Sequence, residues 1–187
     1  MVDQAKEPLG ASAPSKSVNK IGERQLSLEV RARRFAFAVL QGSDLLDWGV
    51  RSYSTGAVGT PSVIEKLRFL LNLYAPPVVI ARETRRAKEK SSEFAARVLG
   101  EIGTELQRQS VRFVVIDRRD VQRFFAQYGC QAKHDTASIL ASQFPQLKAR
   151  LPRARRPWDP EAYAVVVFDA IATAVTFNGV PLIPEDG

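Results

Sequence analysis

The segment from residue 25 to residue 54 has the pattern that most restricts the fold of this chain. Large apolar residues recur at every second position in three short runs, and a Gln-Gly-Ser-Asp turn occupies positions 41–44. A period of two residues predicts strands, and the short turns predict that successive strands are antiparallel. The apolar positions of the three predicted strands are Leu26, Leu28, Val30, Phe35, Phe37, Val39, Leu46, Trp48 and Val50.

Glu29 lies in the first predicted strand and is out of phase with the apolar residues around it. Successive side chains of a strand point to opposite faces, so we expect Glu29 on the face of Ser27 and Arg31. A carboxylate in the middle of such a strand is either solvated, paired with an arginine, or a metal ligand. The residues alone leave these three interpretations open.

The rest of the chain alternates between helical and strand patterns. Apolar residues at helical spacing between Thr60 and Tyr74 predict an amphipathic helix, which Pro76 and Pro77 end. Short apolar runs predict two buried strands, and a long helix between them predicts a right-handed parallel crossover. The strands are expected at 78–81 and 111–116, and further helices at 84–109, 117–129, 133–144 and from Asp159 to Val175.

Asp169 is the only carboxylate beyond the first turn of the last predicted helix, which is otherwise so apolar that it must be buried. Burial of an ionised carboxylate without a partner costs several kcal/mol. Asp169 therefore needs a cation, an arginine or a hydrogen-bond network.

A second carboxylate, Glu83, ends the strand predicted at 78–81, where ligands collect in sheets of alternating strands and helices. Its alternative role is a surface residue neutralised by nearby arginines.

Composition restricts the class of protein. The chain has 187 residues, of which 45% are hydrophobic, and a formal charge of +7 with a pI near 9.9. These values favour one globular domain with a polyanionic partner. Cys130 and His134 are the single residues of their types, which argues against a disulfide and a His/Cys zinc site.

We expect a disordered basic tail at 1–24, one domain at 25–178 and a C-terminal tail at 179–187. The chain lacks an apolar run of membrane-spanning length and a signal-peptide core, which predicts a cytoplasmic protein.

Two segments are dense in basic residues, residues 84–90 and 148–158. Each has an ordinary interpretation, the first as a solvated helix start and the second as an extended linker with one tryptophan packed on the core. Each also suits contact with a phosphate backbone, because guanidinium and ammonium groups neutralise phosphates. The candidate nucleic-acid-binding residues are Arg82, Arg85, Arg86, Lys88, Arg153, Arg155 and Arg156.

Two parts of the chain resemble the RuvC-type Holliday-junction resolvases. Leu26-Ser27-Leu28-Glu29-Val30-Arg31 and Ala36-Phe37-Ala38-Val39 are similar to that family's opening strands, Leu-Gly-Ile-Asp-Pro-Gly and Gly-Tyr-Gly-Val. Asp169-Ala170-Ile171-Ala172 resembles the end of its last helix, Asp-Ala-Ala-Asp-Ala-Leu-Ala. The tail around this helix also resembles a poorly characterised group of RuvC-like bacterial proteins.

The resemblance implies an α/β fold of the RNase H-like type, with a mixed five-stranded sheet of three antiparallel and then two parallel strands, and helices on both faces. It implies that Glu29, Glu83 and Asp169 are the catalytic residues and hold Mg²⁺ or Mn²⁺. The implied activity is structure-selective cleavage of phosphodiester bonds in branched DNA, during recombination or repair, by a homodimer. Some members of the family have a histidine near the metal site, so His134 and the adjacent Asp135 are either functional there or surface and capping residues.

Two departures from the family pattern keep an alternative open. Glu29 stands where the family has aspartate, and Val166 stands at the remaining acidic position, where it cannot bind metal. The alternative is a nucleic-acid-binding module that kept the fold and lost nuclease activity. A third hypothesis is a domain of the same fold that binds a small molecule or a protein, with a binding constant that is indifferent to salt.

Overall fold

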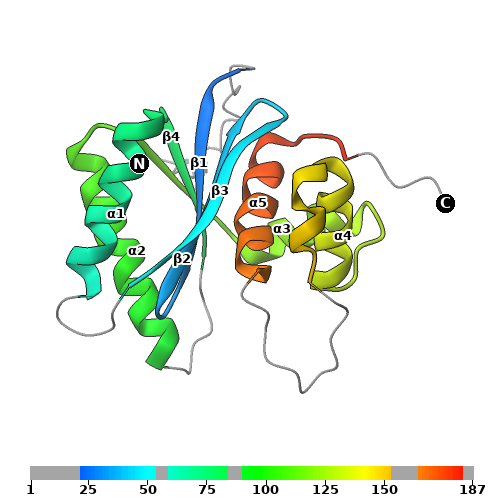
Figure 1. Ribbon diagram of the computed structural model, residues 1–187. Helices are drawn as coiled ribbons and strands as arrows, with labels where there is room; N and C mark the ends of the chain where they lie inside the picture. Colours follow the sequence, from blue (N-terminus) through cyan, green and yellow to red (C-terminus); the bar gives the residue numbers. More distant parts are fainter. Residues whose placement is uncertain (1–21, 54–58, 84–89, 153–163, 183–187) are drawn as a thin grey trace, which may run out of the picture.

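The computed structural model of the protein describes residues 22–53, 59–83, 90–152 and 164–182. Its centre is a five-stranded sheet with the strand order β3-β2-β1-β4-β5 (Figure 1). β1 and β2 are antiparallel, as are β2 and β3, whereas β4 lies parallel to both β1 and β5. This arrangement confirms the predicted mixed sheet. The strands are β1 (Arg24–Arg31), β2 (Arg34–Gln41), β3 (Asp44–Ser52), β4 (Val78–Arg82) and β5 (Arg112–Ile116).

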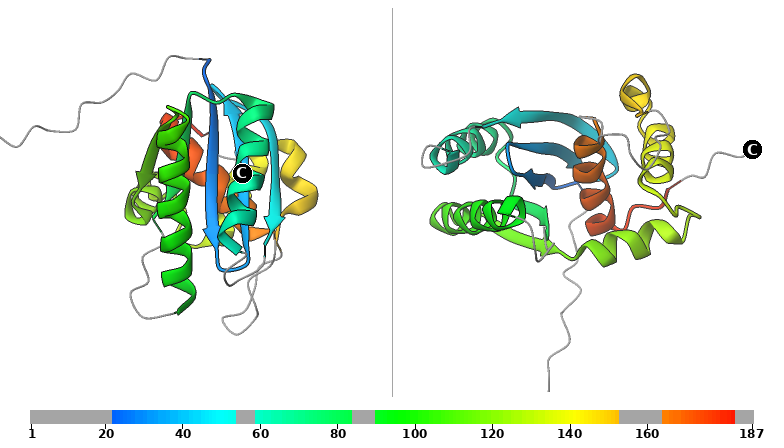
Figure 2. Two further views of the ribbon diagram at one scale, coloured as in Figure 1. Left: turned by 90° about the vertical axis from the view of Figure 1, so that its left-hand side faces the viewer. Right: turned by 90° about the horizontal axis from the view of Figure 1, so that it is seen from below.

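Helices cover both faces of the sheet, as predicted. Seen from below in Figure 2, α1 and α2 lie on one side of the sheet and α5 lies on the other, with α4 outside α5. α3 and α4 pack against α5 rather than forming a layer of their own on the sheet. The helices are α1 (Gly59–Tyr74), α2 (Lys90–Arg108), α3 (Arg118–Ala126), α4 (Lys133–Gln143), the 3₁₀ helix η1 (Pro145–Arg150) and α5 (Val165–Asn178).

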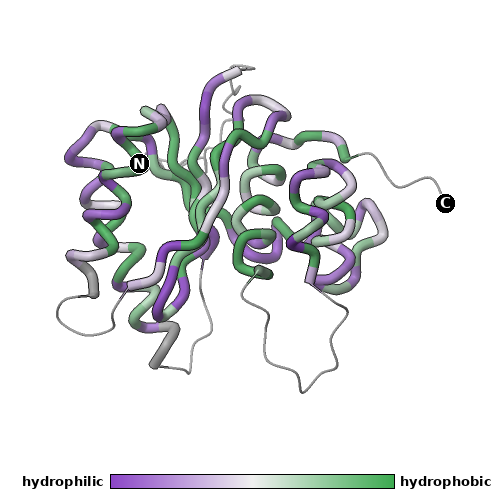
Figure 3. Tube along the Cα trace, viewed as in Figure 1, coloured by the Kyte–Doolittle hydropathy of each residue, from purple (hydrophilic) through white to green (hydrophobic). Residues whose placement is uncertain are grey.

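The alternation in β1 and β2 separates two hydrophobic cores. Leu26, Leu28 and Val30 face α1 and α2, while the small side chains of Ala36 and Ala38 face α5. α5 is buried without interruption from Val165 to Val175, and it is hydrophobic along its length in Figure 3. A helix of this composition is stable only when it is enclosed on all sides. α5 ends at Gly179, which adopts the left-handed conformation that closes many helices.

The third strand departs from the prediction. The register between β2 and β3 shifts between Val39 and Leu40, so that Val39 pairs with Asp47 and Leu40 pairs with Leu45. Leu46 has no partner across this irregularity, and its side chain is exposed rather than buried. Trp48 and Val50 consequently pack against the α5 side of the sheet. The predicted apolar set for β3 was therefore wrong at Leu46.

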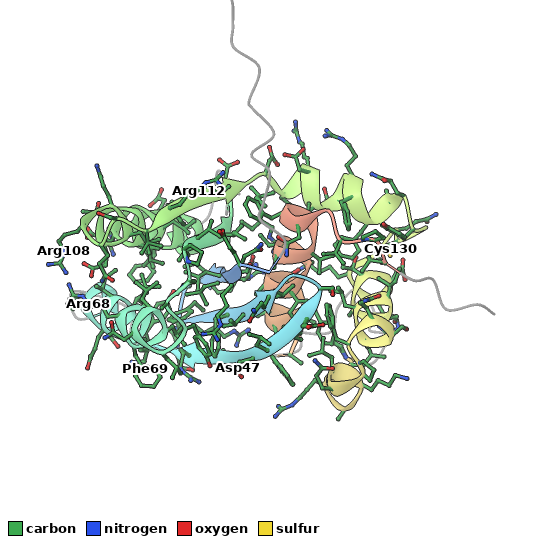
Figure 4. All side chains as sticks on the ribbon, turned by 90° about the horizontal axis from the view of Figure 1, so that it is seen from above. Asp47, Arg68, Phe69, Arg108, Arg112 and Cys130 are labelled. Atoms are coloured by element: carbon green, nitrogen blue, oxygen red, sulfur yellow. The ribbon has the colours of Figure 1, made fainter. Side chains whose placement is uncertain are left out.

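Glu105 joins the two helices that cover the opposite face. It lies on α2 and is 6% exposed. Its Oε1 accepts a hydrogen bond of 2.7 Å from Arg68 Nε on α1 and one of 2.9 Å from Arg108 Nη2. Figure 4 shows Arg68 and Arg108 side by side at the outer edge of this helix pair. Hydrogen bonds from Arg68 and then Arg108 hold the pKa of Glu105 well below its ordinary value, so this carboxylate is ionised across the neutral range.

Several predicted boundaries fall outside the described residues. These include the tails at 1–21 and 183–187, the basic segment at 84–89 and the predicted helix start at Asp159. The described part of the last helix begins at Val165. Residues 145–150, which overlap the predicted linker, form the 3₁₀ helix η1. Among the described residues, the helices are too short or too polar to cross a membrane.

Candidate functional site

Two predicted site residues meet where β1 and β4 end against α5. The parallel register pairs Leu28 with Ala81, so the next residues along, Glu29 and Arg82, come level with each other. Ser27 lies on the same face of β1 as Glu29, and its hydroxyl donates a hydrogen bond of 2.8 Å to the carbonyl of Ala170 on α5. Asp169 precedes Ala170, and this contact brings it over the end of the strand. The expected face for Glu29 is confirmed.

Arg82 lies between the two carboxylates. Its Nη2 is 2.7 Å from Glu29 Oε1 and 3.2 Å from Asp169 Oδ2, and its Nη1 is 3.3 Å from Asp169 Oδ1. The side chains of Arg82, Glu29 and Asp169 are 8%, 0% and 10% exposed. One guanidinium therefore bridges a carboxylate of β1 and a carboxylate of α5 in a nearly closed space.

Two further cations join the group among the described residues. Arg31 Nη2 lies 2.7 Å from Asp169 Oδ2 and 3.1 Å from Glu29 Oε1, and Lys133 Nζ lies 3.2 Å from the same Asp169 oxygen. The side chains of Arg31 and Lys133 are 32% and 41% exposed, so these two residues form the outer rim. We call the five residues the Arg82 cluster. Two carboxylates and three cations give it a formal charge of +1.

The two carboxyl groups titrate differently. Burial raises the pKa of Glu29, and the attraction of Arg82 does not fully offset that effect. Burial acts in the same direction on Asp169, but the charges of Arg82, Lys133 and Arg31 outweigh it and hold the pKa of Asp169 below its ordinary value. The charges of Glu29 and Asp169 also hold the pKa of Arg82 above its ordinary value, against the effect of burial. Arg82 is therefore a permanent cation.

The cluster does not fit a divalent metal ion. Mg²⁺ and Mn²⁺ bind oxygen ligands that are free to face the ion, and here a guanidinium occupies the space between the two carboxylates. A divalent ion at that place would meet three positive charges at short range. Oε2 of Glu29 is buried without a hydrogen-bond partner in the described part of the chain, but one oxygen is too few ligands. No group of three or more His, Cys, Asp and Glu side chains among the described residues is placed to hold a metal ion.

Glu83 forms no metal-holding group with Glu29 and Asp169 in the part of the chain that the structure describes. Its backbone amide donates a hydrogen bond of 2.8 Å to the carbonyl of Ile116, which continues the pairing of β4 with β5. Adjacent residues of a strand point to opposite faces, so the position level with Glu29 belongs to Arg82 and not to Glu83. The expected set of three metal-binding acids is therefore reduced to two.

Arg82 also differs from its prediction as a nucleic-acid contact. It is 7% exposed and engaged with both carboxylates, so it is not available at the surface. The other six candidates, Arg85, Arg86, Lys88, Arg153, Arg155 and Arg156, lie outside the described residues.

Val166 and Asp135, which the sequence also singled out, have structural roles. Val166 is fully buried in the core under α5. Asp135 accepts hydrogen bonds from the backbone amides of Gln131 and Ala132, which is the capping role. His134 lies beside Lys133 at the start of α4, with Nδ1 buried and unpaired in the described structure.

Arg31 and Lys133 were missed as site residues. The phase of β1 could have identified Arg31, because it shares a face with Glu29, whereas Lys133 had no local signal.

Comparisons with known proteins agree with the sheet topology. No protein-family model matches the chain, and no curated protein matches its sequence. Among solved structures, RuvC of T. thermophilus in complex with Holliday-junction substrate superposes with a TM-score of 0.61 at 16% identity, over 84% of this chain and 94% of RuvC. The yeast mitochondrial Holliday-junction resolvase Ydc2 superposes with a TM-score of 0.59 at 10% identity, over 84% of this chain and 79% of Ydc2. The chain thus has the RuvC-like form of the RNase H-like fold, with an arginine between its two inward-facing acids.

Proposed function

We propose that this protein binds branched DNA through its RuvC-like fold and does not cleave it. The observation that carries the proposal is the position of Arg82 between Glu29 and Asp169. Metal-dependent nucleases use clustered carboxylates to hold the ions that activate water and stabilise the leaving oxygen. Here the same type of side chain neutralises an arginine, which leaves the carboxylates no free charge with which to bind an ion.

DNA as the partner is supported by charge and by fold. The chain carries a formal charge of +7. A protein of similar fold, RuvC of T. thermophilus, has been solved with Holliday-junction substrate. We place the DNA contacts on the two basic segments of the sequence, which carry Arg85, Arg86 and Lys88, and Arg153, Arg155 and Arg156. The resemblance to RuvC-type resolvases also leads us to propose a homodimer, which sedimentation equilibrium would test.

The second candidate is the Mg²⁺-dependent endonuclease implied by the resemblance. It is favoured by the meeting of Glu29 and Asp169, which come from β1 and α5 as the resemblance requires. It is opposed by the count of acids and by the three cations around them. For this candidate, Arg82 would have to leave the space between the two carboxylates when DNA binds.

A single assay separates the two candidates. A labelled four-way junction and a linear duplex of the same sequence are incubated with the protein in Mg²⁺, Mn²⁺ or EDTA, and are run on native and denaturing gels. We expect a shift of the junction in all three conditions and no cleavage. Cleavage that disappears in an Asp169→Asn variant would refute the proposal and support the nuclease. The absence of both shift and cleavage at moderate salt would reject both candidates, and binding that is indifferent to salt would favour a partner other than nucleic acid.

A further inference from the structure

We propose that Arg31 forms a phosphate-binding site that needs no divalent ion, at the rim of the Arg82 cluster. Its ligand would be a backbone phosphate of the bound DNA, so this inference rests on the proposed function. In a metal-dependent nuclease, metal ions present positive charge to the phosphate. In this protein a side chain presents that charge.

The surroundings of Arg31 hold its guanidinium in a fixed position. Arg31 is the last residue of β1, and its carbonyl accepts a hydrogen bond from the hydroxyl of Tyr53, which anchors the backbone. Its Nη2 is fixed by Glu29 and Asp169. A guanidinium held in this way has already lost much of the freedom that a ligand would otherwise have to restrict, which favours binding.

Arg31 retains donors for a ligand. A guanidinium has five N–H groups, and the contacts with Glu29 and Asp169 are made through one terminal nitrogen. Its Nε is buried without a hydrogen-bond partner among the residues that the structure describes, which leaves the terminal nitrogens, on a side chain that is about a third exposed, as the donors for a ligand. The fork geometry of a guanidinium matches the oxygens of a phosphate.

The charge of the cluster allows an anion to approach. Glu29 and Asp169 would repel a phosphate, but Arg82, Arg31 and Lys133 outnumber them by one. Glu29 and Arg82 are buried, so the groups that a ligand meets first are the two rim cations. The geometry therefore favours a phosphate over a cation at this place.

The test measures binding of a labelled four-way junction by fluorescence anisotropy over a range of salt concentrations, in EDTA and in Mg²⁺. We expect Arg31→Gln to weaken binding roughly fivefold to tenfold at about 0.1 M salt and to reduce the salt slope by about 1, as for the loss of one phosphate contact. Arg31→Lys should restore the salt slope but only part of the affinity, because lysine keeps the charge and lacks the fork of the guanidinium. The matched control is Lys66→Gln, at a lysine of α1 on the opposite side of the sheet, which should bind as the wild type does.

Two measurements keep the test decisive. Thermal unfolding of each variant shows whether Arg31→Gln is folded, and the wild-type comparison of EDTA with Mg²⁺ needs no variant. The inference is overturned if Arg31→Gln binds as Lys66→Gln does, or if wild-type binding is lost in EDTA. If the wild type does not bind the junction in any condition, the proposed function itself is wrong, which is a different outcome from either of these.

Discussion

Replacement of Arg82 by methionine tests whether the Arg82 cluster holds the structure together. Methionine has a similar length but no charge, so the substitution leaves Glu29 and Asp169 facing each other, with the rim cations Arg31 and Lys133 as their remaining partners among the described residues. Glu29 is fully buried and, within the described part of the chain, would keep one ion pair, with Arg31 at 3.1 Å. The decrease in the free energy of unfolding therefore measures the cost of an incompletely paired carboxylate in the core.

The expected loss of stability is large. Removal of one partner from a buried ion pair costs about 3–5 kcal/mol, because the remaining charge stays desolvated. A typical domain is stable by about 5–15 kcal/mol, so the variant should be close to unfolding at moderate denaturant. The addition of Glu29→Gln to Arg82→Met should recover part of the loss, since it removes the unpaired charge. The coupling between the two substitutions should be about 0.5–3 kcal/mol.

The assay is equilibrium unfolding in urea at pH 7 for the wild type, both single variants and the double variant. Arg123→Met is the matched control, because Arg123 pairs with Asp120 at 2.9 Å on α3, with side chains that are 74% and 52% exposed. That pair should contribute less than about 1 kcal/mol. A loss of less than about 1 kcal/mol for Arg82→Met, equal to that of the control, would refute the structural role of the cluster.

Three further predictions concern stability. Glu105→Gln should destabilise the protein most at neutral pH. The pKa of Glu105 is lowered in the folded state, so its contribution to the free energy of unfolding is present above the unfolded pKa of 4.5 and is lost as the pH falls below that value. Urea unfolding of the wild type and the variant at several pH values would show this dependence. An effect that grows on acidification would contradict this sign. Gly49→Ala should cost about 1–3 kcal/mol of stability, because a Cβ there would lie 2.9 Å from the ring of Phe37. Gly100→Ala, in open space on α2, should instead stabilise the protein by about 0.5–1 kcal/mol. Equal effects of the two substitutions in thermal unfolding would argue against the packing at Phe37. Ser27→Ala should cost about 1 kcal/mol in urea unfolding through loss of the bond to the carbonyl of Ala170, and no change would mean that this contact contributes nothing to the docking of α5.

Much of the fold was predictable because local patterns determined it. The alternation in β1 and β2 identified the two faces of the sheet, and the pattern of strand, helix and strand identified the parallel crossover. The uniform apolarity of α5 predicted its burial. The exposed Leu46 was not predictable, because the irregularity between Val39 and Leu40 depends on how two strands pair and not on either strand alone.

The site was predictable only in part. The isolation of Asp169 in an apolar helix indicated a buried carboxylate that requires a partner, whereas the sequence around Glu29 left solvation, an arginine partner and a metal ion all open. Both carboxylates are buried and paired with arginines. The identity of the third member depended on the register between β1 and β4, which places Arg82 and not its neighbour Glu83 level with Glu29. Adjacent residues of opposite charge at a strand end leave that choice open until the pairing is known.

The position of Arg82 between the two carboxylates is tested most directly by a crystal structure of the protein grown with Mn²⁺, with anomalous diffraction data collected at the manganese edge. We predict no manganese peak between Glu29 and Asp169, with the guanidinium of Arg82 in contact with both. A manganese ion bound to both carboxylates, with Arg82 displaced from between them, would contradict it.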